Sequence, residues 1–472
     1  MKLKGLLLGA LCIASAASAQ QLKSDLPAVY ITIPSDAVVN TETYVTTQMT
    51  FVDADGTSTT YADTKLRGRG SAKFALDKKP YKLKLLAKAR LLGPDGANAK
   101  KWNLMAQAGD KTLLRNAVAS FIALKAGQPF APGCRFVDLV INDEYQGTYQ
   151  LTDQIDIRKK RVHITEQPEL LDAGADISGG YLLEIDDSAD DLEGTVFTTS
   201  RGVKITVKSP DEDYIVAKQK DYIAAHVQLF EDALFADNWL DPTAGYRKYI
   251  DLDSFIQWYI TAEYTAEPNS FRSVYFYKEL GDDRLTFGPV WDFDFAFDNS
   301  ARFGSRPRAL IAQEGRGEPW CYVWIDRLRQ DPAFHTAVNE AWKKLLDARI
   351  VDEVNDYINR QAAVLAKSQA LNFAIYPIAE KAHDEQHLFS TYAEGIEFLK
   401  QTQAARADFL TEAFATLASG GTVPIVGDQN SLDEVAAAAN DADAETYDLQ
   451  GRRVLAPARG IYIRSGKAIL IR

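Results

Sequence analysis

Residues 285–295 read Leu-Thr-Phe-Gly-Pro-Val-Trp-Asp-Phe-Asp-Phe. The alternation predicts a strand that runs on past the proline and places Asp292 and Asp294 on one face, with aromatic side chains on the other. Paired carboxylates at a strand end suit magnesium or manganese, which offsets the charge of nucleotide phosphates during phosphoryl transfer. The alternative is a solvent-facing strand edge with two acids of no special role, and the spacing alone leaves both interpretations open.

Upstream of this stretch, a glycine-containing loop leads into a basic strand. Residues 66–71 read Leu-Arg-Gly-Arg-Gly-Ser, and residues 78–85 read Lys-Lys-Pro-Tyr-Lys-Leu-Lys-Leu. Alternation puts Lys82 and Lys84 on the same strand face, and spare backbone N–H groups of the loop would attract anions. The pattern is compatible with a phosphate cradle, but a lone Gly-x-Gly is weak evidence, and on its own it favours a tight turn before a solvated basic strand.

A second carboxylate pair lies in the middle of the chain. Residues 181–186 read Tyr-Leu-Leu-Glu-Ile-Asp, so Glu184 and Asp186 share one face of a predicted strand. Such a pair also suits the acid and base of a glycoside hydrolase, for which the separation of the two carboxyl groups is decisive. The sequence does not give that separation.

The order of predicted elements indicates an α+β body with a helical subdomain. Strands are predicted at about 29–86, 136–155, 181–186, 203–208, 273–277 and 285–294. Helices are predicted at 111–126 after a cap at Asp110, at 214–236, after a cap at either Asp251 or Asp253, and almost throughout 331–417. The acidic, alanine-rich residues 419–445 are predicted to be a linker, and residues 446–472 a short β unit.

Composition and the N-terminus bear on partners and location. The 472 residues carry a net charge of -12, which disfavours a nucleic acid partner. Residues 1–19 combine two lysines, a short apolar run and an Ala-Ser-Ala end, which predicts a secretory signal peptide and export. No later apolar run is long enough to cross a bilayer. Beyond the signal, Cys134 and Cys321 are the only cysteines, and a disulfide or two separate thiols fit equally well.

Six segments, taken in order, resemble the CotH family of spore-coat-type atypical protein kinases. They are residues 67–71, 78–84, 114–116, 142–149, 180–186 and 288–294. The resemblance spans roughly residues 29–417, within a predicted domain of residues 20–418. It implies a divergent kinase-like fold that binds ATP with magnesium or manganese and phosphorylates serine or threonine on exported proteins.

The resemblance also implies roles for individual residues. Asp292 would be the metal-binding acid, comparable in role to the aspartate of the DFG element, with Asp294 beside it. The side chains implied to bind the nucleotide are Arg67, Arg69, Lys79, Lys82, Lys84 and Glu184.

The chain departs from the family pattern at the expected catalytic aspartate. Where the family has Asn-x-Asp, residues 267–269 read Glu-Pro-Asn. The amide of Asn269 cannot accept a substrate proton, so catalysis is in question. Either Glu267 takes over the base or metal role, or the protein is a pseudokinase that acts as a surface or assembly binding protein. A carbohydrate-active envelope protein ranks third.

The C-terminal residues resemble the sorting modules of Bacteroidetes proteins exported by type IX secretion. The segments that carry this resemblance are residues 447–454, 459–463 and 466–472, and they are shorter than the full module. The resemblance implies an outer-surface or released protein. A small β accessory without a sorting role is the alternative.

Overall fold

The computed structural model describes residues 24–172, 174–186, 194–302, 308–313 and 320–424, and the backbone of residues 446–447, 460–464 and 467–471. The predicted signal peptide and most of the predicted linker lie outside the described residues. Helices and sheets are mixed along the chain, which confirms the predicted α+β class.

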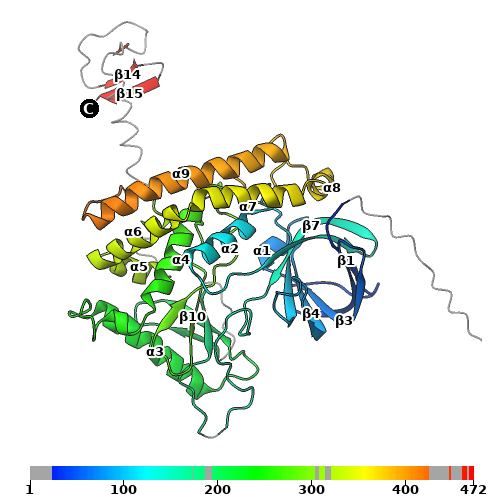
Figure 1. Cartoon of the computed structure of the whole chain (residues 1–472), viewed down its shortest axis with the longest axis horizontal. Helices are drawn as coiled ribbons and strands as arrows, with labels where there is room; N and C mark the ends of the chain where they lie inside the picture. Colours follow the sequence, from blue (N-terminus) through cyan, green and yellow to red (C-terminus); the bar gives the residue numbers. More distant parts are fainter. Residues whose placement is uncertain are drawn as a thin grey trace, which may run out of the picture.

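The N-terminal part is a closed β-barrel (Figure 1). In barrel order its strands are β1 (Ala28–Thr32), β2 (Val45–Val52), β3 (Ser58–Gly68), β4 (Tyr81–Ala89), β5 (Ala99–Met105), β7 (Glu144–Asp153) and β6 (Cys134–Ile141). Neighbouring strands are antiparallel except β1 and β6, which pair in parallel and close the barrel. The strands β6 and β7 form the hairpin that the sequence predicts.

Side chains alternate between the inside and outside of this barrel. On β4, Leu83 and Leu85 are buried in the barrel core, whereas Lys82 and Lys84 point outward. Lys82 lies opposite Arg67 of β3, and Lys84 lies opposite Lys101 of β5. The predicted basic strand face is therefore present, and it continues onto both neighbouring strands.

A second, antiparallel sheet lies after the barrel in the sequence. Its order is β12 (Leu285–Phe287), β11 (Val274–Lys278), β8 (Tyr181–Ile185), β10 (Lys204–Ser209) and β9 (Val196–Thr198). The central strand β8 is buried along its whole length. Hydrophobic side chains of this sheet and of the helices form one continuous core, separate from the barrel core.

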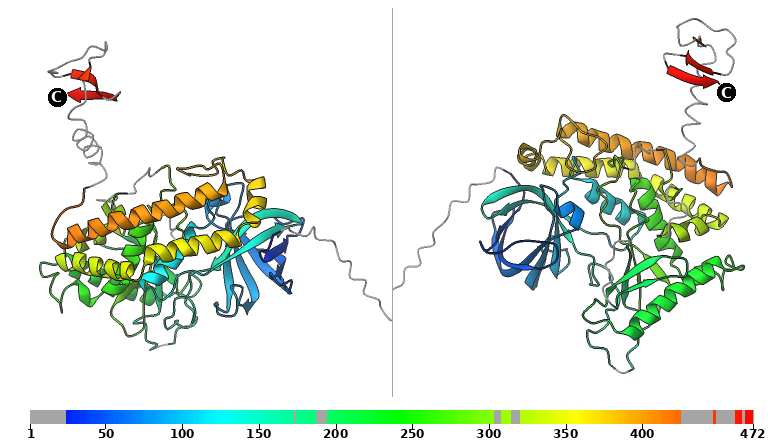
Figure 2. Two further views of the ribbon diagram at one scale, coloured as in Figure 1. Left: turned by 45° about the horizontal axis from the view of Figure 1, so that its top comes forward. Right: turned by 180° about the vertical axis from the view of Figure 1, so that it is seen from behind.

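Helices form the rest of the molecule. They are α1 (Ser71–Phe74), α2 (Arg115–Ala126), α3 (Ala217–Phe235), α4 (Leu252–Thr265), α5 (Tyr322–Leu328), α6 (Pro332–Asp347), α7 (Ile350–Val364), α8 (Ser368–Ile375) and α9 (Tyr392–Ala418), with short 3-10 turns η1 (Tyr246–Lys248) and η2 (Ile311–Gln313). Both views of Figure 2 show α7 and α9 running side by side along one edge, and α8 reaches the barrel strand β7.

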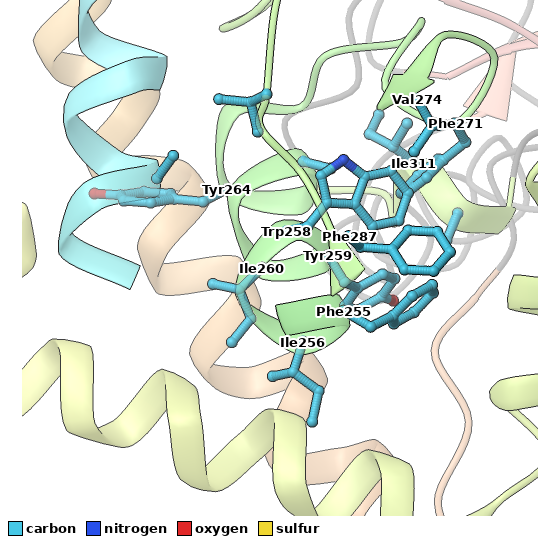
Figure 3. Packing of buried hydrophobic residues seen from close by; sticks show 14 of the residues in the cluster. Phe255, Ile256, Trp258, Tyr259, Ile260, Tyr264, Phe271, Val274, Phe287 and Ile311 are labelled. Atoms are coloured by element: carbon cyan, nitrogen blue, oxygen red, sulfur yellow. The ribbon is translucent and has the colours of Figure 1, made fainter. Parts of the chain in front are cut away.

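Helix α4 is the centre of the larger core (Figure 3). Asp251, one of the two predicted cap positions, caps it by accepting a hydrogen bond from the Ser254 N–H. The ring of Phe287 on β12 lies between Phe255 and Trp258, with ring centroids 4.8 and 5.7 Å away. Strand β12, which leads into the acidic stretch, is thereby fixed to the core.

Three elements differ from their predicted bounds. Helix α2 begins at Arg115 rather than residue 111, because the Asp110 carboxylate accepts the N–H groups of Thr112 and Arg115 and folds the intervening residues into a turn. Strand β12 ends at Phe287, because Gly288 has φ +110° and Pro289 lacks an N–H for a ladder hydrogen bond. The C-terminal helical block is interrupted at residues 376–391.

The cysteines and the C-terminal β unit complete the fold. Cys134 and Cys321 are both free thiols rather than a disulfide. The strands β13 (Thr446–Tyr447), β14 (Gly460–Arg464) and β15 (Lys467–Ile471) form a small antiparallel sheet, described here by itself. No helix in the described part of the chain has the length and apolarity needed to span a bilayer.

Candidate active site

A cavity of about 710 Å³ lies where the outer face of the barrel meets the second sheet. Its basic side chains come from β3, β4 and β5 and from the ends of neighbouring elements: Arg67, Arg69, Lys82, Lys84, Lys88, Lys100, Lys101, Arg158 and Lys208. Acidic side chains line other parts of it: Asp153, Asp156, Glu166, Glu184, Asp186, Asp211, Glu212, Asp213 and Asp292. Its apolar lining includes Met105, Val290, Trp291 and Phe293. A cavity of this volume with convergent polar groups suits a ligand of small-molecule or cofactor size.

The basic wall of this cavity carries like charges directly opposite one another. Arg67 faces Lys82, and Lys84 faces Lys101 across adjacent strands, an arrangement that is unfavourable unless an anion lies between the charges. Burial, and then the positive charges of Arg67 and Arg69, lower the pKa of Lys82 to about 8. This wall has the electrostatic character of an anion-binding surface.

At one edge of the cavity, two carboxylates converge on a single ammonium group. The Lys73 Nζ lies 2.9 Å from Oδ1 of Asp292 and 2.7 Å from Oδ1 of Asp294. The Arg69 guanidinium lies 3.5 Å from the same oxygen of Asp292 and over the ring of Trp291. The pair predicted from the sequence is therefore brought together, but by a turn in which Asp292 has φ +60°, not by strand alternation.

The N-terminal end of α2 holds this acidic turn in place. Asn116 accepts the Phe293 N–H at 2.6 Å, and the Arg115 Nε donates to the Ala296 carbonyl at 2.8 Å. The Arg115 guanidinium is itself fully buried and paired with Asp110 at 2.5 Å. These contacts fix the backbone on both sides of Asp294.

Burial and the nearby positive charges shift the pKa values of the two aspartates in opposite directions. Burial by itself raises the pKa of Asp292, but Lys73 and Arg69 outweigh it and hold that pKa at about 2. Burial raises the pKa of Asp294, an effect that Lys73 opposes and the neighbouring Asp292 adds to. For Lys73, the two carboxylates outweigh burial and raise its pKa above the ordinary value. The three groups act as one buried ionic unit.

The short loop before Lys73 explains the local position of this lysine. A Cβ at Gly68 would come 2.5 Å from the ring of Phe74, so only glycine lets α1 fold back against the end of β3. The N–H groups of Gly68 and Arg69 donate to the carbonyls of Asn40 and Pro80. The prediction of spare amides for phosphate is thus wrong for these two residues, and the glycines serve the turn.

Glu267 and Asn269 lie in the turn after α4, and neither lines the large cavity. Burial, and then the charge of Asp294, raise the pKa of Glu267 well above its ordinary value. One carboxyl oxygen of Glu267 accepts the Asn269 N–H at 3.0 Å, while the other is buried without a hydrogen-bond partner. Glu267, not Asn269, is thus the group in electrostatic contact with the pair.

The remaining predicted nucleotide-binding residues divide into two groups. Arg67, Arg69, Lys82, Lys84 and Glu184 all line the large cavity, where the Glu184 carboxylate pairs with Lys208 at 3.1 Å. Lys79 does not line it. Its Nζ donates to the carbonyls of Phe74 and Leu76, which makes it a clamp on the turn between α1 and β4.

Sequence reasoning missed Lys73 and gave no role to Asn116. Lys73 lies three residues after Gly70, the second glycine of the loop. Its place just after this turn was the one sign in the sequence that its side chain could point back toward the site. Asn116 stands in one of the six family-like segments. Its function as an acceptor for the turn depends on a contact between residues 177 positions apart, which spacing cannot reveal.

The donor set fits a divalent cation of the magnesium or manganese type. Two aspartate oxygens already surround one cationic atom. Among the described residues, no group of three or more histidine, cysteine or acidic side chains is arranged to hold a metal alone. Magnesium commonly binds through one or two carboxylates plus substrate phosphates and water, which matches this pair beside a basic cavity.

A protein-family model described as CotH kinase protein matches residues 65–410. The matched range covers more than half of the chain and includes the basic wall, the acidic pair and Glu267. No curated protein matches the chain.

The lowered pKa of Lys82 makes the anion affinity of the cavity dependent on pH. Because this pKa is about 8, the positive charge is present below pH 8 and lost as the pH rises through it. We expect calorimetry to show tripolyphosphate binding about tenfold weaker at about pH 9.5 than at about pH 6.5, the effect of losing one charge-assisted hydrogen bond of about 1.5 kcal/mol.

The variant Lys82→Arg is the control for this measurement, because a guanidinium keeps its charge across the range. It also corrects for the protonation of tripolyphosphate itself. An equal loss of affinity in Lys82→Arg would remove Lys82 from the anion site.

Proposed function

The chain belongs to the CotH kinase family, and on that premise we propose that it binds ATP with a divalent cation and transfers the terminal phosphoryl group to serine or threonine of exported proteins. The observation that carries this proposal is the convergence of Asp292 and Asp294 on one cationic atom at the edge of a cavity that has a basic wall. A nucleotide needs phosphate-binding cations and a metal site side by side, and this arrangement supplies both.

The outer face of the barrel would hold the phosphates. Arg67 and Arg69 both act electrostatically on Lys82 and disfavour its positive charge, a repulsion that a bound phosphate would relieve. The rings of Trp291 and Phe293 and the side chains of Met105 and Val290 give the same cavity apolar surface. That apolar surface suits the base and ribose of a nucleotide. The same cavity thus offers both a basic surface for phosphates and an apolar surface for the nucleoside.

Asp292 and Asp294 would hold the divalent cation, which when bound neutralises charge that develops on the transferred group. Asn116 and Arg115 keep the backbone of the acidic turn fixed, so the carboxylates need no rearrangement to bind. Asp292, whose side chain is 27% exposed and lines the cavity, faces the phosphates, and the more buried Asp294 supports it.

Glu267 is the best candidate for the base that accepts the proton of the attacking hydroxyl. A general base works best when its pKa lies near the operating pH, and burial next to Asp294 moves the pKa of Glu267 upward from the ordinary acidic range. Asn269 can orient that carboxylate through its backbone N–H but cannot accept a proton. In this assignment, Glu267 replaces the family's aspartate.

We also propose that residues 1–19 direct export and that the C-terminal β unit takes part in sorting to the cell surface. The support is the order of lysines, apolar run and Ala-Ser-Ala end. Mass spectrometry of the protein from its native host is expected to find an exported chain that begins at Gln20. Recovery of a cell-retained chain that still begins at Met1 would contradict this proposal.

Loss of the cavity-facing carboxylate should remove metal-dependent nucleotide binding. We expect Asp292→Asn to weaken ATP binding in the presence of manganese at least about a hundredfold, since even outer-shell partners of metal ligands contribute about 10- to 100-fold. Isothermal titration calorimetry on residues 20–472 measures this directly. The control is Asp352→Asn on the exposed surface of α7, which makes the same chemical change and should leave binding intact. Equal ATP affinity in Asp292→Asn and wild type would rule out the metal assignment.

Glu267 and Asn269 are the two positions at which the chain departs from the family pattern. Substitutions at these positions are expected to affect phosphoryl transfer differently. Glu267→Gln should lower phosphoryl transfer about a hundredfold or more while nucleotide binding stays within a few-fold, because the amide cannot accept a proton. Asn269→Asp should change the rate little. Transfer is measured with radiolabelled ATP, to casein and to the protein itself.

One outcome of that comparison favours the pseudokinase. If the wild type transfers no phosphate and Asn269→Asp gains transfer, the natural protein is a catalytically silent member that binds nucleotide only. Glu267 would then have no base role.

A further inference from the structure

Lys73 occupies the position at which the proposed function requires a divalent cation. Its Nζ is within hydrogen-bond distance of one oxygen from each aspartate, at 2.9 and 2.7 Å. A metal ion and an ammonium group cannot share this position, since both need the same two oxygens and carry like charge. The two aspartates therefore already have a counter-ion within the chain.

The setting of Lys73 allows it to move. It lies on α1, a single turn of four residues whose N-terminal neighbour Gly70 has φ +66° and gives no side-chain cap. The Lys73 side chain is 22% exposed, so it is not enclosed by packing. Lys73 has a flexible four-carbon stem. The second cation at the site, Arg69, is held more firmly, because its guanidinium group is nearly buried over the ring of Trp291.

A displaced Lys73 needs a new negative partner. Removing one partner of a buried ion pair leaves an uncompensated charge, which is strongly unfavourable. Besides the two aspartates, the described groups that act on Lys73 are Arg69, the ring of Phe295 and the carboxyl of Glu267. Burial raises the pKa of Glu267 well above its ordinary value and so disfavours its charged form, which leaves no established anion to receive the ammonium group. The large cavity bordered by Arg69 and Asp292 is where an incoming polyphosphate would supply negative oxygens.

We infer that Lys73 is a displaceable internal counter-ion, which holds the position between Asp292 and Asp294 until a divalent cation and a polyphosphate arrive together. This inference rests on the proposed function. It makes metal and nucleotide binding mutually dependent, since the nucleotide takes over the ammonium group that the metal displaces. Free divalent cation alone then binds weakly, and Lys73 is a positioning residue whose ammonium passes from carboxylate to phosphate.

The competing explanation is that Lys73 is a permanent structural link between the barrel and the acidic turn. In that case its removal would loosen the turn and weaken metal binding. The two explanations thus predict opposite changes in the affinity for metal alone.

The test is calorimetric titration of manganese chloride, without nucleotide, into residues 20–472 of the wild type, Lys73→Met and Lys73→Arg. Lys73→Met should bind manganese at least about tenfold more tightly than the wild type, because the competing charge is gone. Lys73→Arg should bind several-fold more weakly, because a guanidinium pairs with carboxylates more firmly than an ammonium does. The control Lys343→Met makes the same change at an exposed lysine of α6, outside the site, and it should match the wild type.

A second titration measures the coupling. Saturation with a non-hydrolysable ATP analogue should raise the manganese affinity of the wild type at least about tenfold, and that of Lys73→Met much less. Manganese affinity in Lys73→Met equal to or below that of the wild type would overturn the inference. So would Lys73→Arg binding as tightly as the wild type, a result that does not depend on Lys73→Met folding. Failure of the wild type to bind the analogue would instead overturn the proposed function, while the metal-only comparison still decides the role of Lys73.

Discussion

Two carboxylates that lie side by side in a largely buried turn require a cation between them, and Lys73 supplies it. This contact joins α1, at the edge of the barrel, to residues 219 and 221 positions later in the chain. It fixes the acidic turn against the barrel at the edge of the basic cavity. Asp292 thereby lines the cavity next to the basic wall that β3, β4 and β5 supply.

A second buried network keeps the acidic turn rigid. Arg115, Asp110 and the Ala296 carbonyl form a fully buried set, and Asn116 holds the Phe293 N–H. Breaking such a buried ion pair by removing one partner typically costs about 3–5 kcal/mol, so the network is a strong constraint on the start of α2. Because the backbone is fixed in this way, replacement of the Lys73 ammonium group by a metal ion would require only side chains to move. The site combines a fixed acidic turn with a lysine on a flexible side-chain stem.

Much of this arrangement was predictable from local pattern. The alternation of Lys82 with Leu83, the hairpin of β6 and β7, and the cap at Asp251 depend on neighbours in sequence, and the structure contains all three. The acidic pair was also identified, although Gly288 and Pro289 end the strand early and a turn replaces it.

The features that local pattern missed depend on long-range packing. The parallel pairing of β1 with β6 that closes the barrel, and the contact of Lys73 with Asp294, join residues far apart in the chain. Lys79 was assigned to the nucleotide by its place in a basic run, but that run turns, and its ammonium lies against backbone carbonyls instead. The positive charges in the sequence predicted the basic wall. The turn between β3 and β4 determines that Lys73, and not Lys79, contacts the two aspartates.

The central claim is that the acidic pair and the basic wall together form a nucleotide and metal site. The most direct test is a crystal structure of residues 20–472 with manganese and a non-hydrolysable ATP analogue, with manganese located by its anomalous scattering. The account predicts one manganese peak at about 2.0–2.5 Å from oxygens of Asp292 and Asp294, with phosphates against Arg69 and Lys82. A manganese peak elsewhere, or nucleotide bound outside the cavity, would contradict it.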